Sequence, residues 1–376
     1  MTKPTTRLIQ SITVRSFRSL ANIENLKLPK LTVLIGPNGA GKSNFIRFFD
    51  MLGWMLGGQN LQEFIIRHGG GDDQLFMGAR KTPRMDAEIC IETARGFSEY
   101  RFGLAHVTAG DKLIFVDEAY RYRHPDRITE DQWHVLDSNG KEANIVEVAQ
   151  QKPPVMTAKI VVNFLNRCTV YQFHDTSEKA NIRLPWDYTD NTLLRPDGAN
   201  LAPILLRLQK QDITRYKLIT RQISRILPTF GDFVLQPAYG KVELRWGSKY
   251  SDKTFGAHLT SDGSLRLFCL LTLLNLPKEM LPDVLFLDEP ELGLHPHAIT
   301  LVSAMLKRLA HDHQIIIATQ SPYMVDCFEL ENIIVADLKD GATSLKTMSR
   351  TEYQQWLDDD YRVSDLWLKE VIGGSP

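Results

Sequence analysis

The chain has 376 residues, of which 43% are hydrophobic and 24% are charged, and its formal net charge at pH 7 is −1. This composition is typical of globular proteins, and the near-zero charge excludes a molecule-wide basic field that would attract nucleic acid. The four cysteines lack the spacing of a zinc site or a disulfide framework. No apolar stretch reaches the roughly 20 residues of a membrane helix. The sequence therefore predicts a soluble, cytoplasmic protein with no membrane partner.

The first strong motif begins at residue 36. The alternating segment 12–20 and the apolar run 31–35 predict two strands, and the amphipathic run that starts near Asn44 predicts a helix. Between the second strand and the helix stands a complete phosphate-binding loop, which consists of Gly36, Pro37, Asn38, Gly39, Ala40, Gly41, Lys42 and Ser43.

This order of strand, loop and helix is the context in which such a loop binds a nucleoside triphosphate. The glycines let consecutive N–H groups point at phosphate oxygens, and the helix that begins near Asn44 directs its positive end at the same anion. Lys42 adds a point charge for the outer phosphates, and the hydroxyl of Ser43 is suited to Mg²⁺. We therefore expect residues 36–44 to bind a nucleotide with magnesium.

The middle of the chain has a different pattern. Alternating segments separated by turn residues predict an antiparallel meander, at 85–93, 98–107, 112–123 and 133–136. Further along, the sequence predicts a strand at 169–173, a helical segment at 201–227, and strands at 233–235 and 242–246.

The last third alternates helices with near-continuous apolar strands. Helices are predicted at 263–276 and 296–310, and strands at 284–287, 314–318 and 332–337. Strands that are apolar throughout indicate a parallel sheet covered on both faces. The fold class is therefore α/β, with a mixed or parallel core sheet and an inserted subdomain that is β-rich and helical.

Two carboxylates follow the predicted strand 284–287. Asp288 stands where the strand leaves the sheet, which is the place of the acidic residue that holds Mg²⁺ in phosphate-loop enzymes. Glu289 comes one residue later and is suited to orient or deprotonate an attacking water.

Residues 288–296, Asp-Glu-Pro-Glu-Leu-Gly-Leu-His-Pro, resemble the Walker B and D-loop segment of ABC-type ATPases, in particular the branch related to RecF, SMC proteins and OLD-type ATPases. Residues 14–20, Val-Arg-Ser-Phe-Arg-Ser-Leu, are similar to the first strand of that branch. The resemblance covers about 8–56 and 255–338. It implies that the nucleotide is ATP, and that the ATPase domain is formed by 1–85 and 231–376 around an insertion at 86–230.

The family also has a signature segment that contacts the γ-phosphate held by a second subunit. Residues 260–264, Thr-Ser-Asp-Gly-Ser, are similar to it and make Ser261, Gly263 and Ser264 candidates for nucleotide contact. Asp262 replaces the first glycine of the signature, so its carboxylate must point away from phosphate or make a different contact. From the residues alone, Ser261 or Asp262 is equally an ordinary helix cap.

Two glutamines complete the predicted site. Gln320 stands where the family has a sensor histidine, so it keeps a hydrogen-bond donor but carries no charge. The family places another glutamine beside the metal; Gln172 is the preferred candidate, since it lies at the end of a strand, and Gln74 is the alternative.

Taken together, the resemblance implies an ATPase that forms a homodimer with ATP at the interface and uses Glu289 in hydrolysis. It would act on DNA in genome maintenance or antiphage defence. Only 56 residues follow Gln320, too few for the nuclease domain of OLD proteins, so a nuclease or other effector is expected on a separate chain. The alternatives are a non-hydrolysing scaffold gated by nucleotide, or the ATP-binding subunit of a membrane transporter.

Overall fold

The computed structural model describes residues 7–57, 60–125, 132–137 and 140–374. The chain divides into two units. Unit 1 comprises Met1–Val170, Asp283–Phe286 and Ala310–Pro376, and unit 2 comprises Tyr171–Pro282 and Leu287–Leu309. These units do not coincide with the expected boundaries after residues 85 and 230, because the strands that open the expected insertion pair with the first strand of the chain.

The first sheet of unit 1 is antiparallel, in the order β2-β1-β4-β5-β6-β7. Its strands are β1 (Leu8–Phe17), β2 (Leu20–Lys27), β4 (Arg84–Thr93), β5 (Gly96–Val107), β6 (Lys112–Arg123) and β7 (His134–Val135). The predicted meander is therefore confirmed. The prediction of a single strand over 12–20 is wrong at its end, because the chain turns after Phe17, where Arg18 has a φ of 48°.

The second sheet has the order β17-β16-β3-β15-β14-β8 and belongs to unit 1, except that β8 enters unit 2 at Tyr171 and β14 enters it at Leu287. Its strands are β3 (Leu31–Ile35), β8 (Cys168–Tyr171), β14 (Val284–Asp288), β15 (Gln314–Ala318), β16 (Ile333–Lys339) and β17 (Ala342–Thr347). Strand β3 is parallel to β15 and β16, while β17 is antiparallel to β16. The core sheet is thus mixed, as the sequence predicts, and every residue of β3, β14 and β15 is buried.

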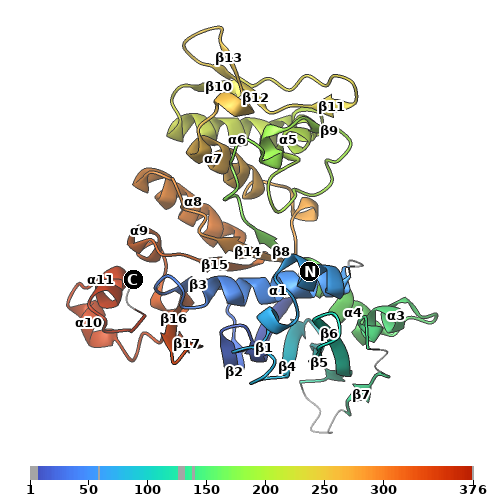
Figure 1. Cartoon of the computed structure of the whole chain (residues 1–376). Coiled ribbons are helices and arrows are strands. Elements are labelled where there is room, and N and C mark those ends of the chain that lie inside the picture. Colours follow the sequence, from blue (N-terminus) through green and yellow to red (C-terminus); the bar gives the residue numbers. More distant parts are fainter. Residues whose placement is uncertain (1–6, 58–59, 126–131, 138–139, 375–376) are drawn as a thin grey trace. The chain divides into compact units, whose positions relative to one another are not determined.

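Helix α1 (Lys42–Leu56) packs between these two sheets (Figure 1). Phe48 meets Phe17 of β1 with ring centroids 5.7 Å apart, and Phe49 stacks on Phe286 of β14 at 4.3 Å. Because both sides of the helix are buried, the loop that precedes it has a fixed position. The other helices of unit 1 are α2 (Leu61–Arg67), α3 (Asn144–Gln150), α4 (Met156–Leu165), α9 (Pro322–Val325), α10 (Gln354–Asp358) and α11 (Val363–Leu368).

Unit 2 combines four helices with two small sheets. The helices are α5 (Leu201–Gln211), α6 (Ile213–Ile226), α7 (Asp262–Leu273) and α8 (Pro296–Leu309). One sheet has the order β10 (Phe230–Phe233), β12 (Arg245–Ser248) and β13 (Thr254–Gly256), and the other pairs β9 (Trp186–Asp187) with β11 (Lys241–Val242).

The helical segment predicted over 201–227 is two helices, because Asp212 ends α5 and caps α6 by accepting a 3.1 Å hydrogen bond from the backbone N–H of Arg215. Unit 2 has an aromatic core, in which the ring of Phe268 on α7 lies 5.4 Å from that of Phe230 and 5.2 Å from that of Phe233. Within the described ranges, no helix is both long and apolar enough to cross a bilayer.

Candidate functional site

The phosphate loop in unit 1 has the backbone of an anion cradle. Gly36, Gly39 and Gly41 have φ values of 148°, 82° and 98°, which residues with a Cβ rarely adopt. Gly41 is the N-cap of α1 and provides no side-chain cap, and the first turn holds no acidic residue. Lys42 Nζ donates to the carbonyl oxygens of Gly36 at 2.6 Å and of Pro37 at 2.9 Å. These two bonds hold the Lys42 ammonium group against the phosphate loop.

The side chains of Ser19, Asn44 and Thr343 form hydrogen bonds with one another next to this loop. Asn44 Nδ2 donates to Ser19 Oγ at 2.8 Å, and Thr343 Oγ1 donates to the same oxygen at 2.7 Å. A Cβ on Gly41 would overlap Thr343 Oγ1, and one on Gly36 would overlap a backbone oxygen of β16. The side chain of Asn44 is therefore bonded to the protein itself. Sequence reasoning missed Ser19 and Thr343, since they lie 324 positions apart and belong to no motif.

Gln320 lies two residues beyond β15, at the sheet edge from which the phosphate loop leaves. Ala318 pairs with Leu34 of the parallel strand β3, and the N–H of Thr319 donates to the carbonyl of Leu34 at 3.0 Å. The carboxyl ends of parallel neighbours meet at one edge of a sheet. The structure thus brings Gln320 and the loop to the same edge of unit 1.

The carboxylate of Asp288, in unit 2, is buried and in contact with a predicted partner. Gln172 Nε2 donates to Asp288 Oδ2 at 3.2 Å, across 116 positions of sequence. His174 Nε2 lies 2.9 Å from the carbonyl oxygen of Asp288 and fixes the same residue from its backbone. Glu289 follows with a φ of 42°, a conformation uncommon for residues other than glycine and one often found at functional sites.

The alternative glutamine is fully engaged elsewhere. Gln74 is completely buried, and its Nε2 donates to the carbonyls of His68 at 2.8 Å and Gly70 at 3.0 Å. Its Oε1 accepts from Arg18 Nε at 3.0 Å. Burial, and then the nearby charge of Arg47, lower the pKa of Arg18 to about 10, so this donor stays protonated at pH 7. Gln172, whose amide meets a carboxylate, remains the better candidate for the metal side.

The predicted signature forms the start of α7. Ser261 is the N-cap and accepts a 3.3 Å hydrogen bond from the N–H of Ser264, while the two hydroxyl oxygens lie 2.8 Å apart. The capping interpretation is therefore confirmed, and the N-terminus of a helix such as α7 also favours anions. A Cβ on Gly263 would lie 3.0 Å from the carbonyl oxygen of Gly293, so this first turn packs closely on the turn that follows Glu289.

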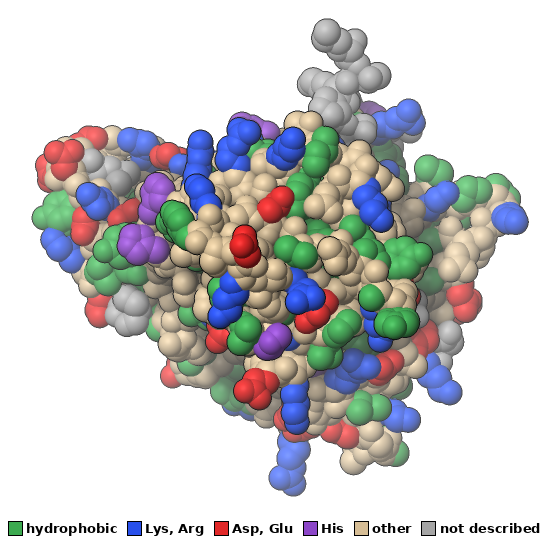
Figure 2. All heavy atoms as spheres, turned by 90° about the horizontal axis from the view of Figure 1, so that it is seen from above, with side chains coloured by type: hydrophobic (Ala, Val, Ile, Leu, Met, Phe, Trp, Pro, Cys, Tyr) green, Lys and Arg blue, Asp and Glu red, His purple; other side chains and the backbone are tan. Residues whose placement is uncertain are grey.

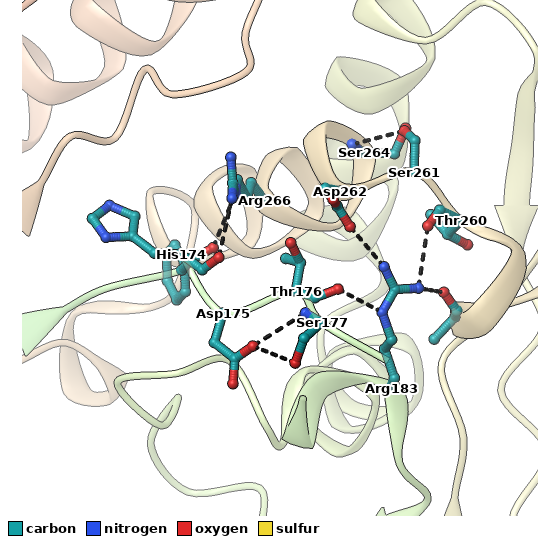
Figure 3. A network of polar contacts seen from close by, with 12 residues as sticks. His174, Asp175, Thr176, Ser177, Arg183, Thr260, Ser261, Asp262, Ser264 and Arg266 are labelled. Carbon is teal, nitrogen blue, oxygen red and sulfur yellow. Dashed lines mark hydrogen bonds and ion pairs between the residues drawn. The ribbon is translucent and has the colours of Figure 1, made fainter. Parts of the chain in front are cut away.

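Two arginines that sequence reasoning missed tie α7 to the segment after β8 (Figure 3). Arg183 Nη2 donates to Asp262 Oδ1 at 2.8 Å. The Asp262 carboxylate, which stands where the signature has a glycine, therefore has a contact within the protein, as the sequence predicts. Arg266 donates from Nε to the carbonyl of Phe173 at 3.2 Å and from Nη2 to that of His174 at 3.0 Å. No local motif marks these arginines, because each acts on residues about 80 to 90 positions away.

The residues present fit a magnesium–triphosphate. An added Cβ on Gly39 would meet nothing within 4 Å, so the cradle opens onto free space beside its N–H groups. The Ser43 hydroxyl in unit 1, and the Asp288 carboxylate and Gln172 amide in unit 2, each offer oxygen, which Mg²⁺ prefers as a ligand. Lys42 carries a positive charge of the kind that outer phosphates attract.

The fold is that of ABC-type P-loop proteins such as the SMC head domains. Two of the solved structures with this fold are SMC heads. The SmcHead bound to the C-winged helix domain of ScpA has a TM-score of 0.56 at 18% identity, and the match covers 92% of this chain and 99% of that structure's chain. An SMC head domain with an extended coiled coil, bound to the C-terminal domain of ScpA from Pyrococcus furiosus, has a TM-score of 0.53 at 14% identity, with 94% and 99% covered.

A family model described as "AAA domain, putative AbiEii toxin, Type IV TA system" matches residues 31–326, and the chain belongs to this family. The chromosome partition protein Smc of Mycolicibacterium paratuberculosis is 34% identical over 85 residues, which are 22% of this chain and 7% of that protein. The DNA replication and repair protein RecF of an Anaeromyxobacter species is 30% identical over 150 residues, 35% of this chain and 40% of that protein. The chain thus matches a small part of Smc and less than half of RecF.

Proposed function

We propose that this chain hydrolyses ATP and that ATP closes it into a homodimer. The observation that carries the proposal is a pair of helix starts, each with a glycine: Gly41 is the N-cap of α1 in unit 1, and Gly263 lies in the first turn of α7 in unit 2. In the proposed dimer, the phosphate loop of one subunit holds ATP and the start of α7 from the second subunit covers the γ-phosphate. The same arrangement, applied twice, gives a two-fold dimer with two nucleotides.

Each predicted residue has a distinct part in this proposal. Lys42 binds the outer phosphates, and Ser43, Asp288 and Gln172 provide oxygen ligands for the metal. When bound, Mg²⁺ neutralises the charge that develops on the transferred phosphoryl group. The buried position of Asp288 and its contact with Gln172 support a shared role for these two residues.

Glu289 is assigned to the attacking water, and Gln320 to a hydrogen bond with water or γ-phosphate. Replacing Glu289 by Gln keeps the shape of the side chain and removes its basicity, so we expect hydrolysis to fall by roughly 10²–10⁴-fold. The rate of phosphate release should be compared among the native chain, Glu289→Gln and Glu279→Gln, which changes an exposed carboxylate in the short turn after α7. Equal, near-background rates for the first two would reject the enzyme and support the non-hydrolysing scaffold.

The same variants test the dimer. With hydrolysis blocked, Glu289→Gln should accumulate as a dimer in ATP and Mg²⁺ and as a monomer without nucleotide. Size-exclusion chromatography with light scattering measures the mass of the eluting protein and so distinguishes the monomer from the dimer. A Glu289→Gln chain that stays monomeric in saturating ATP would contradict ATP-gated association.

A basic surface on unit 2 supports a nucleic-acid partner. Residues 201–253 contain ten Lys or Arg and only four Asp or Glu, although the whole chain has a net charge of −1. Helices α5 and α6 hold no acidic residue, and Lys217, Arg221 and Arg225 recur at four-residue spacing, about 6 Å along α6. All three are exposed. On the face seen in Figure 2, Lys and Arg side chains are interspersed with Asp, Glu and hydrophobic ones, so the basic character is that of this segment and not of the whole face.

This row of cations continues beyond the end of α6. The backbone N–H of Lys249 donates to the carbonyl of Thr229 at 2.9 Å, which joins the loop between β12 and β13 to the chain that leaves α6. The same loop exposes Tyr250, 73% accessible, and Lys253. Cations with an interleaved aromatic ring are suited to a phosphate backbone and its bases. Whole-chain charge conceals this surface because acidic segments elsewhere cancel it.

Duplex DNA binding measured against salt tests this surface. If the row contacts phosphates, Arg221→Glu should weaken binding and lower the slope of log affinity against log salt by about one per lost contact. Lys27→Glu, which changes an exposed lysine of unit 1, is the matched control for net charge. Identical slopes for the two variants would assign the surface to a protein partner instead.

We further propose that the ATPase works with a separate effector in genome maintenance or antiphage defence. The family description names a toxin of a toxin–antitoxin system, and the SMC heads with the same fold are bound to the partner protein ScpA. Both facts support an ATPase that acts through a second polypeptide. Co-purification of the Glu289→Gln chain from its own cells, with and without ATP, would identify that polypeptide or show that there is none.

A further inference from the structure

Asp262, the residue that departs from the signature, is an exposed carboxylate on a helix expected to approach a triphosphate. It is the first residue of α7, and its side chain is 61% exposed. A carboxylate here favours the helix itself, because it lies at the positive end of the helix dipole. The same charge would repel an incoming phosphate and occupy the N–H groups that phosphate needs.

The side chain of Arg183 removes this conflict. It comes from the short 3₁₀ helix Asn181–Arg183, and it is only 9% exposed where it meets Asp262. Its Nη1 donates to the carbonyls of Ala257 and Thr260, the latter at 3.2 Å, and its Nε donates to the carbonyl of Thr176 at 2.8 Å.

These contacts fix the guanidinium before any ligand arrives. Three chain segments, the turn at Thr176, the 3₁₀ helix Ala257–Leu259 and the start of α7, are joined by one planar group whose donors have fixed directions. The bond to Asp262 therefore has a set direction, and Figure 3 shows the carboxylate turned toward Arg183 and away from Ser261 and Ser264. The two serines of the α7 start are left on the side without the carboxylate.

We propose that Arg183 is a positioning residue for the α7 anion site, and that the Arg183–Asp262 pair takes the place of a signature glycine. Arg183 cancels the charge of Asp262 and turns its carboxylate aside, so that phosphate from a second subunit can reach Ser261 and Gly263. This inference rests on the proposed ATP-gated dimer, since it assigns a role within that interface. It adds a residue that no motif contains.

The proposal predicts that removing the charge of Asp262 compensates for the loss of Arg183. If Arg183 only crosslinked three segments, removing that charge would compensate for nothing. In the full-length chain carrying Glu289→Gln, Arg183→Met should weaken ATP-dependent dimerisation by roughly tenfold to a hundredfold, the range of hydrogen bonds to charged groups. Adding Asp262→Asn to Arg183→Met removes the stranded carboxylate and should restore most of that loss. Arg183→Lys keeps the charge without the fork and should lie between Met and the native residue.

Three measurements separate the outcomes. Sedimentation gives the dimer dissociation constant in ATP and Mg²⁺, thermal unfolding reports whether each variant folds, and nucleotide binding at protein concentrations below dimerisation reports the phosphate loop. Nucleotide affinity of the monomer should be equal in all variants, because Arg183 and Asp262 serve the nucleotide of the other subunit. If the double variant dimerises no better than Arg183→Met, the charge role of the pair is overturned.

Asp262→Asn alone keeps the proposal testable if Arg183→Met does not fold. This variant keeps every contact of Arg183 with backbone carbonyls and should dimerise at least as well as the parent. Loss of dimerisation in Asp262→Asn would show that the carboxylate itself contacts the partner, which contradicts the proposal. A parent chain that never dimerises in ATP would instead reject the proposed function, so the two failures are distinguishable.

Discussion

The two anion sites of this chain are built in different ways. The site at α1, in unit 1, consists of consecutive residues: backbone N–H groups, three glycines with positive φ and one lysine. The site at α7, in unit 2, has a serine cap and an acidic residue that is acceptable only because Arg183 reaches it from 79 positions away. Distant residues support both sites, but Ser19 and Thr343 only bond with Asn44 next to the α1 loop, whereas Arg183 pairs with a charge inside the α7 segment itself.

The largest expected effect on nucleotide binding is at α1. Because Lys42 is the only side-chain cation in the loop, Lys42→Ala should weaken nucleotide binding by roughly a hundredfold. Titration with a fluorescent ATP analogue measures this, and Lys27→Ala, at an exposed position of the same unit, is the control. Unchanged affinity in Lys42→Ala would show that residues 36–43 do not hold the phosphates.

The next effect is on stability, and it distinguishes the glycine that the fold requires from the one that only needs a positive φ. A Cβ at Gly36 would overlap the backbone of β16, so Gly36→Ala should lower the free energy of unfolding by about 2–4 kcal/mol, from backbone strain and overlap together. Gly39 shares a positive φ but has open space around it, so Gly39→Ala should lower it by about 1–2 kcal/mol.

Urea unfolding without nucleotide tests this order of effects. A destabilisation of Gly39→Ala equal to that of Gly36→Ala would mean that the close contact with β16 contributes nothing. In that case the φ values alone would account for the glycines.

The smallest effect concerns the metal side of unit 2. Gln172→Ala removes a proposed metal ligand together with the amide that contacts Asp288, and we expect the Mg²⁺ concentration for half-maximal hydrolysis to rise at least roughly tenfold. Gln74→Ala is the matched control, because it removes a buried amide that is bonded only within unit 1. Gln74→Ala should reduce stability and leave the Mg²⁺ requirement unchanged. If Gln74→Ala raised the Mg²⁺ requirement and Gln172→Ala did not, Gln74 would be the glutamine beside the metal.

Elements with a local pattern could be predicted from the sequence. The strands of the meander, the apolar strands β3, β14 and β15, and the helix after the phosphate loop have the expected types, because periodicity and turn residues act over a few positions. The sequence did not predict the turn at Arg18, which has no glycine to mark it, or the break at Asp212 between α5 and α6. Two strand predictions were also wrong in their bounds: β10 ends at Phe233, so 233–235 is not a strand, and 242–246 is divided between β11 and β12.

The division into units and the supporting contacts of the site needed the tertiary structure. The strands at 84–123 have a pattern that fits an inserted subdomain equally well, and only pairing between β1 and β4 places them in the first sheet of unit 1. The same holds for Ser19 with Thr343, and for Arg183 with Asp262, since nothing within either segment specifies the other.

By itself, the sequence determined that this chain has a phosphate loop, a strand that ends in two carboxylates, and a helix start after Ser261, since each depends on residues that are neighbours along the backbone. Only the tertiary structure decided which glutamine meets Asp288 and how the carboxylate of Asp262 is accommodated. Those two outcomes depend on which distant segments fold side by side, and such pairings follow from the packing of the whole chain rather than from any short stretch of it.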